Sequence, residues 1–178
     1  MKKARKGRST LILVLGGAAS GKSQAALDLA GQAGPKAFVA TGQALDREMK
    51  VRIERHQATR SPDWETSEVP MDIAKWLAVN NHIYQVIILD CLTLWLSNLK
   101  GKRLSNLGVC DATTDLLQAI RATKARVVIV SNELGLGLVP ATKPVRAFRD
   151  LAGRINQQVA AEADEVYFII SGLRLRLK

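Results

Sequence analysis

Five short, almost entirely apolar runs alternate with longer amphipathic segments along the chain, and few folds accommodate this alternation. Such runs are typical of strands that are buried on both faces of a parallel sheet. The predicted strands are Leu11–Leu15, Ala37–Thr41, Val86–Asp90, Val127–Ser131 and Val166–Ile170. The predicted helices are Lys22–Ala33, Leu45–Ala58, Asp72–Val79, Asp111–Lys124 and Val145–Ala163. The sequence therefore predicts an α/β fold with a mostly parallel central sheet flanked by helices.

No internal repeat, low-complexity tract or interdomain linker interrupts this pattern. The chain has 178 residues, which is enough for one good hydrophobic core. We therefore expect one domain over residues 10–178, preceded by a basic flexible tail over residues 1–9. The stretch Lys100–Gly108 is rich in Gly, Lys, Arg and Asn and predicts an exposed loop. The last predicted helix carries an apolar core face, which consists of Phe148, Leu151, Ala152, Ile155 and Val159.

The positive charge of the chain is concentrated at its two ends. The formal net charge is +10, but five basic residues lie within residues 1–8 and three within the last five positions, so the body is nearly neutral. Aromatic residues make up 4% of the chain, which argues against a stacking platform for single-stranded nucleic acid. We interpret the basic ends as solvated termini and expect no specific nucleic-acid partner.

The apolar runs and the cysteines exclude several other classes of protein. No apolar run approaches the roughly 20 residues that a membrane-spanning helix requires, and the basic start leads into only a short apolar run. Cys91 and Cys110 have neither a disulfide pattern nor a zinc-binding spacing. We therefore expect a cytoplasmic protein without membrane insertion.

The strongest local motif fits G-x-x-x-x-G-K-[ST] and lies between a predicted strand and a predicted helix. Its residues are Gly16, Gly17, Ala18, Ala19, Ser20, Gly21, Lys22 and Ser23. In such a phosphate-binding loop (P-loop), successive backbone N–H groups curl around phosphates, which side chains at the glycines would obstruct. Lys22 would reach the terminal phosphates and Ser23 would bind Mg²⁺. The alternative interpretation is a glycine-rich turn without a ligand.

A P-loop also needs an acid at the end of a nearby strand to hold the metal. Asp90 closes the run Val-Ile-Ile-Leu-Asp and is the natural candidate, so the predicted metal ligands are Ser23 and Asp90. Asp90 could instead cap a following helix. We interpret the adjacent Cys91 as a buried filler rather than a nucleophile.

One of the two histidines has the surroundings of a nucleophile. If the predicted helix continues far enough, Arg52, His56 and Arg60 share one face. Two guanidinium groups would keep the imidazole neutral and bind phosphate oxygens, which favours attack on a nucleoside triphosphate. A solvated basic helix face is the alternative. His82 follows two asparagines in a turn-like stretch, and we expect it at the surface.

Several sequence motifs, taken together and in their order along the chain, resemble those of one known family over nearly the whole chain. They are GGAASGKS, ATGQALDREMKVRIERH, VIILDCLT, VSNELGLGLVP and FRDLAGRINQQVAAEADEVYFIISG. Together they closely resemble the bifunctional adenosylcobinamide kinases/adenosylcobinamide-phosphate guanylyltransferases of cobalamin biosynthesis. The resemblance implies a RecA-like P-loop fold, a homotrimer, and the substrates adenosylcobinamide and GTP, with ATP as a further phosphoryl donor. It implies phosphorylation of adenosylcobinamide and then GMP transfer through a guanylylated histidine, His56.

The resemblance also implies nucleotide-binding residues beyond the P-loop. These are Thr41, Gly42, Gln43, Arg52, Gln57, Ala58, Thr59, Arg60, Glu68 and Asp90. Asn132 and Glu133 follow another predicted strand at the sheet edge where such folds bind ligands, and we expect them to support substrate or metal. A helix cap or a turn acid is the alternative for this pair. Arg146, Arg149 and Asp150 match a family string without a derived role.

The chain departs from the family pattern at the P-loop. The family commonly has arginine where this chain has Ala19, and losing that cation places kinase efficiency in more doubt than guanylyl transfer. Three alternative functions stay open at this point. They are a small-molecule P-loop kinase without guanylyl transfer, a RecA-like ATPase stimulated by nucleic acid, and a non-catalytic nucleotide-binding regulator.

Overall fold

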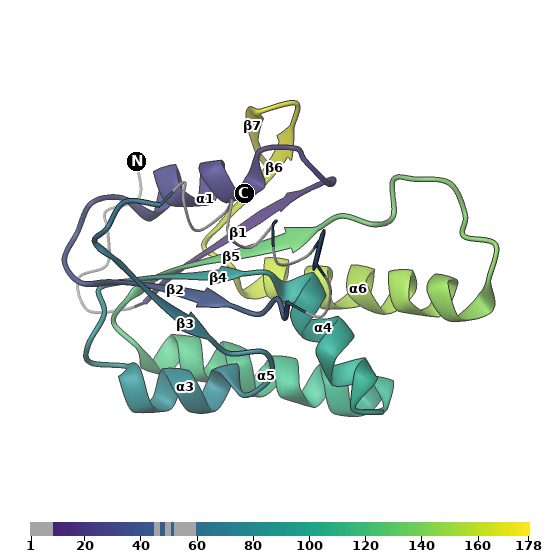
Figure 1. Ribbon diagram of the computed structural model, residues 1–178, viewed down its shortest axis with the longest axis horizontal. Coiled ribbons are helices and arrows are strands. Elements are labelled where there is room, and N and C mark those ends of the chain that lie inside the picture. The colour runs from purple at the N-terminus through teal and green to yellow at the C-terminus, as the bar shows by residue number, and fades with distance from the viewer. Residues whose placement is uncertain (1–8, 45–46, 49–50, 52–59) are drawn as a thin grey trace.

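The computed structural model describes residues 9–44, 47–48, 51 and 60–178. Within them, seven strands form one sheet in the order β3-β2-β4-β5-β1-β6-β7 (Figure 1). The strands are β1 (Thr10–Gly16), β2 (Lys36–Ala40), β3 (Trp64–Glu68), β4 (Val86–Asp90), β5 (Arg126–Asn132), β6 (Glu165–Ile170) and β7 (Leu173–Arg176). All neighbouring pairs are parallel except β6 and β7. The predicted α/β fold with a mostly parallel sheet is confirmed.

Helices cover both faces of this sheet because its inner strands alternate their side chains between two apolar clusters. On β1, Leu11, Leu13 and Leu15 belong to one cluster, whereas Ile12 and Val14 belong to the other. Figure 1 shows α1 on one face and α3, α4, α5 and α6 on the opposite face. The helices span α1 (Lys22–Ala30), α3 (Ile73–Asn80), α4 (Leu92–Gly101), α5 (Asn106–Ala122) and α6 (Lys143–Glu162).

The five predicted strands are present within one or two residues, but two edge strands were not predicted. Strand β3 has the polar sequence WETSE and pairs only with β2. Strand β7 alternates leucine and arginine, is exposed throughout and pairs only with β6. An edge strand is not enclosed on both sides, so neither sequence shows the uniform apolar run by which the inner strands were predicted.

The prediction of an exposed loop over Lys100–Gly108 is wrong for most of these residues. Helix α4 follows β4 directly and continues to Gly101, and α5 begins at Asn106. The side chain of Ser105 accepts a hydrogen bond from the N–H of Gly108 and caps α5. The true connection is therefore short, because glycine and polar residues that predict a loop occupy helix ends here.

The predicted helix over residues 45–58 falls mostly outside the described residues, although residues 47–48 and 51 are helical. The tail over residues 1–8 also lies outside them, whereas Ser9 is buried. The apolar face of α6 is confirmed, since Leu151 and Ile155 are buried and Phe148 packs against the same cluster. Among the helices that the structure describes, none is long and apolar enough to span a membrane.

Candidate functional site

The candidate P-loop occupies the connection between β1 and α1, as predicted. A Cβ at Gly16 would lie 2.4 Å from the carbonyl oxygen of Ile169 and 2.7 Å from Ser20 Oγ, so only glycine fits there. Gly21 has a φ of 95°, which glycine adopts without strain. The exposed Ala19 is also left-handed, with a φ of 54°. The close approach of Ile169 therefore explains Gly16, and the local backbone conformation explains Gly21.

The start of α1 faces this loop with an uncapped end. No side chain caps the helix, so its first N–H groups remain available for an anion. The Lys22 side chain is buried, and its Nζ donates a hydrogen bond of 2.5 Å to the carbonyl oxygen of Gly17. Lys22 thus bends back across the loop and holds its ammonium group where bound phosphates would lie.

Ser23 and Asp90 meet across the sheet, as expected of a metal-binding pair. The hydroxyl of Ser23 donates a hydrogen bond of 2.9 Å to Asp90 Oδ2. Strand β5 lies between β1 and β4, so the P-loop strand and the strand of Asp90 are separated by one strand. A hydroxyl and a carboxylate fit Mg²⁺, which takes oxygen ligands and commonly completes its shell with phosphates and water. No group of three or more His, Cys, Asp or Glu suited to a metal occurs in the part of the chain that the structure describes.

Thr41, predicted to bind nucleotide, joins the ends of β2 and β4 in this structure. Its hydroxyl donates to the carbonyl oxygen of Cys91 at 2.7 Å and accepts from the Cys91 N–H at 2.8 Å. Its own N–H donates to the carbonyl oxygen of Asp90, and Asn98 donates to its carbonyl oxygen. Because Thr41 is fully buried, its side chain fixes the backbone that carries Asp90. The neighbouring Gly42 and Gln43 are more exposed.

Arg60 lies within electrostatic range of the Asp90 carboxylate. Its guanidinium group stacks 3.3 Å from the centre of the Phe38 ring and donates to Thr66 Oγ1 at 3.0 Å. Burial lowers the pKa of Arg60, and the negative charge of Asp90 opposes this effect. Glu68 is exposed and is paired in register with Ala40 at the same edge of the sheet. Arg60 thus contacts β2 and β3, and Glu68 lies on β3, which β2 separates from the strand of Asp90.

Cys91 is a buried residue of the fold, as predicted. Burial, reinforced by the neighbouring Asp90 charge, raises the pKa of its thiol to about 12. Its sulfur accepts from the N–H of Leu94 and caps α4. The thiol therefore stays protonated at neutral pH and is not a nucleophile.

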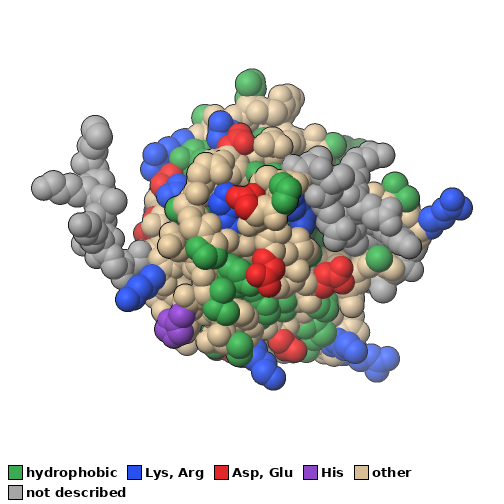
Figure 2. Space-filling model, turned by 60° about the vertical axis from the view of Figure 1, so that its left-hand side comes forward, with side chains coloured by type: hydrophobic (Ala, Val, Ile, Leu, Met, Phe, Trp, Pro, Cys, Tyr) green, Lys and Arg blue, Asp and Glu red, His purple; other side chains and the backbone are tan. Residues whose placement is uncertain are grey.

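The predicted nucleophile and its nearest neighbours lie outside the described residues. They are His56, Arg52, Gln57, Ala58 and Thr59. His82, in contrast, is exposed as expected, and Figure 2 shows a histidine at the surface. In that view acidic and basic side chains are interspersed rather than gathered into one basic surface.

A buried polar network beside the P-loop was missed by the sequence analysis. Ser131 Oγ donates to Asn156 Oδ1 at 2.7 Å and lies 3.3 Å from Thr93 Oγ1. The Asn132 N–H donates to Thr93 Oγ1, and Asn156 Nδ2 donates to the Asn132 carbonyl oxygen. Polar residues on the apolar faces of a strand and two helices are the signal that could have indicated it.

This network positions the residues that follow β5. Asn132 is paired in register with Gly16, and the N–H of Glu133 donates to the Gly16 carbonyl oxygen at 3.0 Å. Glu133 Oε1 accepts from the N–H of Gly135 at 2.7 Å, which is the turn-acid role left open by its sequence. Arg146 donates to the carbonyl oxygens of Pro140 and Ala141. The β5–α6 segment is thus tied to the P-loop at one end and to α6 at the other.

We predict that Asn156→Ala lowers the free energy of unfolding by about 2–3 kcal/mol, because it removes the acceptor of the buried Ser131 hydroxyl and the side-chain donor to the Asn132 carbonyl oxygen. The measurement is urea denaturation monitored by circular dichroism. The exposed neighbour Gln157→Ala serves as the control and should change stability by less than about 0.5 kcal/mol. Equal stabilities of the two variants would contradict the role of the network.

The C-terminal hairpin also contacts the P-loop. The N–H of Gly172 in the β6–β7 turn donates to the Ser20 carbonyl oxygen at 3.0 Å. Arg174 Nη2 lies 3.7 Å from Asp28 Oδ2 of α1. The C-terminal end was expected to be a solvated terminus, but Leu173–Arg176 form strand β7 and Arg174 contacts α1, while the preceding Gly172 contacts the P-loop.

These features define a P-loop nucleotide-binding protein of RecA-like architecture. Among solved structures, the KaiC-like protein PH0186 from Pyrococcus horikoshii OT3 aligns with a TM-score of 0.53 at 11% identity, over 89% of this chain and 70% of that chain. At this identity the likeness shows the fold alone.

The sequence assigns the family. Residues 12–177 match the family described as cobinamide kinase / cobinamide phosphate guanyltransferase. The bifunctional adenosylcobalamin biosynthesis protein CobU of Escherichia coli K12 is 36% identical over 94% of this chain and 99% of its own length. The corresponding protein CobP of Pseudomonas aeruginosa is 40% identical over 93% of this chain and 96% of its own length. The chain belongs to the cobinamide kinase / cobinamide phosphate guanyltransferase family and is a transferase, as its sequence predicted.

Proposed function

We propose that the protein phosphorylates adenosylcobinamide and then converts the product to adenosylcobinamide-GDP. The observation that carries this proposal is the family match over residues 12–177, on a fold in which Ser23 and Asp90 are in contact beside the P-loop. A nucleoside triphosphate, ATP or GTP, supplies the phosphoryl group in the first reaction. GTP supplies GMP in the second.

In the kinase reaction, the aminopropanol hydroxyl oxygen of adenosylcobinamide attacks the γ-phosphorus, and the bond to the β-phosphate oxygen breaks. Lys22 and the N–H groups of the P-loop stabilise the negative charge that develops on the phosphates. Ser23 and Asp90 would hold Mg²⁺, which supplies further charge neutralisation when it is bound. Thr41 keeps Asp90 in place through the backbone of Cys91.

In the guanylyl transfer, a neutral imidazole nitrogen of His56 attacks the α-phosphorus of GTP and pyrophosphate leaves. A phosphate oxygen of adenosylcobinamide phosphate then attacks the same phosphorus, and His56 leaves with the electron pair of the broken bond. The covalent intermediate divides one displacement into two that use the same positioned nucleophile. Arg52, Gln57, Ala58, Thr59 and Arg60, together with Gly42, Gln43 and Glu68, form the proposed nucleotide site around the histidine.

Two further proposals concern the oligomeric state of the protein and its location in the cell. We propose a homotrimer, as the family resemblance implies, and a subunit interface is supported by exposed apolar side chains on the β5–α6 segment: Leu136, Leu138 and Val139. We also propose that the protein acts in the cytoplasm, where its free cysteines would remain reduced.

The proposal is tested by a pulse–chase experiment. The protein is incubated with α-labelled GTP and Mg²⁺, freed of nucleotide, and then given unlabelled adenosylcobinamide phosphate. The expected result is labelled protein whose label moves quantitatively to a small molecule on the chase. A small-molecule kinase without guanylyl transfer would leave the protein unlabelled, and this outcome would overturn the second activity.

A further inference from the structure

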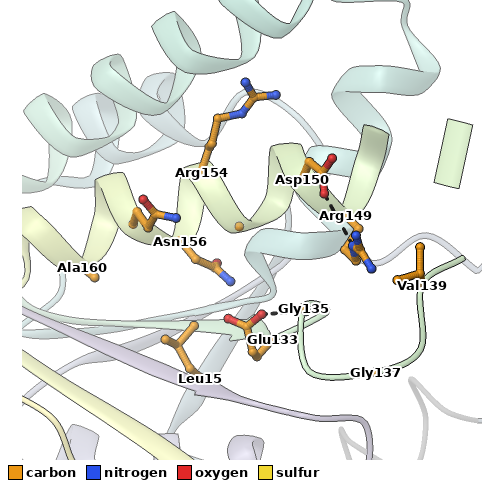
Figure 3. Close-up of a pocket in the computed structure, with 12 residues that line it drawn as sticks. Leu15, Glu133, Gly135, Gly137, Val139, Arg149, Asp150, Arg154, Asn156 and Ala160 are labelled. Atoms are coloured by element: carbon orange, nitrogen blue, oxygen red, sulfur yellow. Dashed lines mark hydrogen bonds and ion pairs between the residues drawn. The ribbon is translucent and has the colours of Figure 1, made fainter. Parts of the chain in front are cut away.

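A cavity of about 660 Å³ lies between α6 and the segment that follows β5 (Figure 3). Residues from β1, the β5–α6 segment and α6 line it. They are Leu15, Glu133, Gly135, Gly137, Val139, Arg149, Asp150, Gly153, Arg154, Asn156, Gln157 and Ala160. Figure 3 shows Glu133 and Leu15 at the sheet end of the cavity and Arg149 beside Val139 at the other end.

The cavity is directly adjacent to the P-loop. Leu15 lines it and immediately precedes Gly16, the first residue of the loop motif. The N–H of Glu133 donates to the Gly16 carbonyl oxygen at 3.0 Å. Leu15 belongs to the apolar cluster on the face of α6, whereas α1 packs on the opposite face. A molecule in the cavity would therefore reach the phosphate site from the side opposite α1.

The lining suits a ligand that is polar and carries little net charge. Two acidic residues, Glu133 and Asp150, are balanced by two basic residues, Arg149 and Arg154. Gln157 is exposed and offers an amide, and the glycines offer backbone groups. A nucleoside triphosphate would bring several negative charges to this balanced site. A corrinoid that is fringed with primary amides matches it better, because an amide both donates and accepts hydrogen bonds.

Gly153 opens the wall of the cavity in the middle of a helix. It lies within the 20 residues of α6, where glycine costs about 1 kcal/mol relative to alanine. Its backbone does not require glycine, because its φ is not positive. A Cβ added there would meet no atom within 4 Å. The glycine therefore keeps a space empty at a cost in helix stability, as expected where a ligand approaches the helix.

We infer that this cavity is the acceptor site, which binds the alcohol-bearing arm of adenosylcobinamide and, in the second reaction, the same arm as its phosphate. This inference rests on the proposed function. Glu133 faces the arm next to the P-loop, and Arg149, whose Nε lies 3.5 Å from Asp150 Oδ1, lies at the far end. The cavity serves both transfers, because both use the same arm as acceptor. The attack of His56 on GTP requires no acceptor and does not involve the cavity.

The test places a larger side chain in the cavity. Gly153→Leu fills the space that the glycine leaves open, and Gly153→Ala is a milder variant that helix propensity favours. Gly101→Leu is the matched control, since a Cβ at Gly101 also meets nothing within 4 Å and Gly101 does not line the cavity. Equilibrium dialysis with adenosylcobinamide measures acceptor binding, and labelling by α-labelled GTP without acceptor measures the histidine step.

We expect Gly153→Leu to weaken adenosylcobinamide binding and raise KM for both acceptors by about tenfold or more, which corresponds to about 1.4 kcal/mol of binding free energy. Gly153→Ala should change adenosylcobinamide binding and the KM values in the same direction but by a smaller factor. Gly101→Leu should match wild type in both measurements. Protein labelling by GTP should be unchanged in all variants. Unaltered acceptor binding by Gly153→Leu, or an equal loss of acceptor binding and GTP labelling, would overturn the inference. A wild-type protein that binds adenosylcobinamide but is never labelled would instead refute the proposed guanylyl transfer, and the dialysis result would still decide the acceptor site.

Discussion

His56→Ala protein is expected to form no covalent guanylyl adduct, and its transfer of GMP to adenosylcobinamide phosphate should fall to background. The expected loss is complete because the variant lacks the nitrogen atom that forms the bond to the α-phosphorus. The measurement is labelling with α-labelled GTP and Mg²⁺, followed by denaturation and tests of the label in acid and base. A phosphohistidine-type bond is labile in acid and stable in base.

His82→Ala is the matched control, because His82 is the other histidine of the chain and is exposed. This variant should be labelled as wild type is. An acid-labile, base-stable label that persists undiminished in His56→Ala would remove His56 from its proposed role. The kinase reaction offers an internal check, because it does not use the histidine and should continue in both variants.

Lys22→Ala should lower the rate of phosphoryl transfer to adenosylcobinamide by about 10²-fold or more, the range found when a group that stabilises transition-state charge is removed. Lys22 is buried at the start of α1 and points back across the P-loop to Gly17. No other described lysine lies in this loop, so its charge is not replaced from within the motif. The measurement is transfer of γ-labelled phosphate from ATP or GTP.

The control for Lys22→Ala is Lys75→Ala, an exposed lysine on α3. It removes the same charge and should keep full activity. Thermal unfolding of both variants separates loss of activity from loss of fold. Retention of wild-type turnover by a folded Lys22→Ala protein would count against the role of the P-loop in catalysis.

The parts of the site that depend on contiguous residues were predictable from the sequence. Gly21, Lys22 and Ser23 satisfy local requirements of backbone conformation and spacing, and the structure places the P-loop between β1 and α1 as expected. Gly16 is recognised by the same spacing, although the contact that requires it comes from Ile169 on β6. The position of Asp90 in the site was predictable because this residue closes an apolar strand. The structure shows its hydrogen bond with Ser23. The inner strands were predictable because burial on both faces leaves a uniform apolar run.

Features that depend on tertiary contacts were not predictable in the same way. Thr41 forms a hydrogen bond with Cys91, which lies 50 positions later in the sequence, and only strand pairing brings the two residues together. The network of Thr93, Ser131 and Asn156 joins two helices and a strand. Helix α4 follows β4 without a glycine or proline to mark its start, so nothing local separates the two elements. In each case, the partner that determines the role is distant in the sequence.

Both proposed transfers are tested together by an analysis of products from one reaction that contains wild-type protein, adenosylcobinamide, GTP and Mg²⁺. Chromatography and mass spectrometry resolve adenosylcobinamide, its phosphate and the GDP-linked species. We expect the phosphate to appear first and then to be converted to adenosylcobinamide-GDP. Accumulation of the phosphate as the final product, or no change in adenosylcobinamide, would contradict the central claim that this one chain catalyses both transfers.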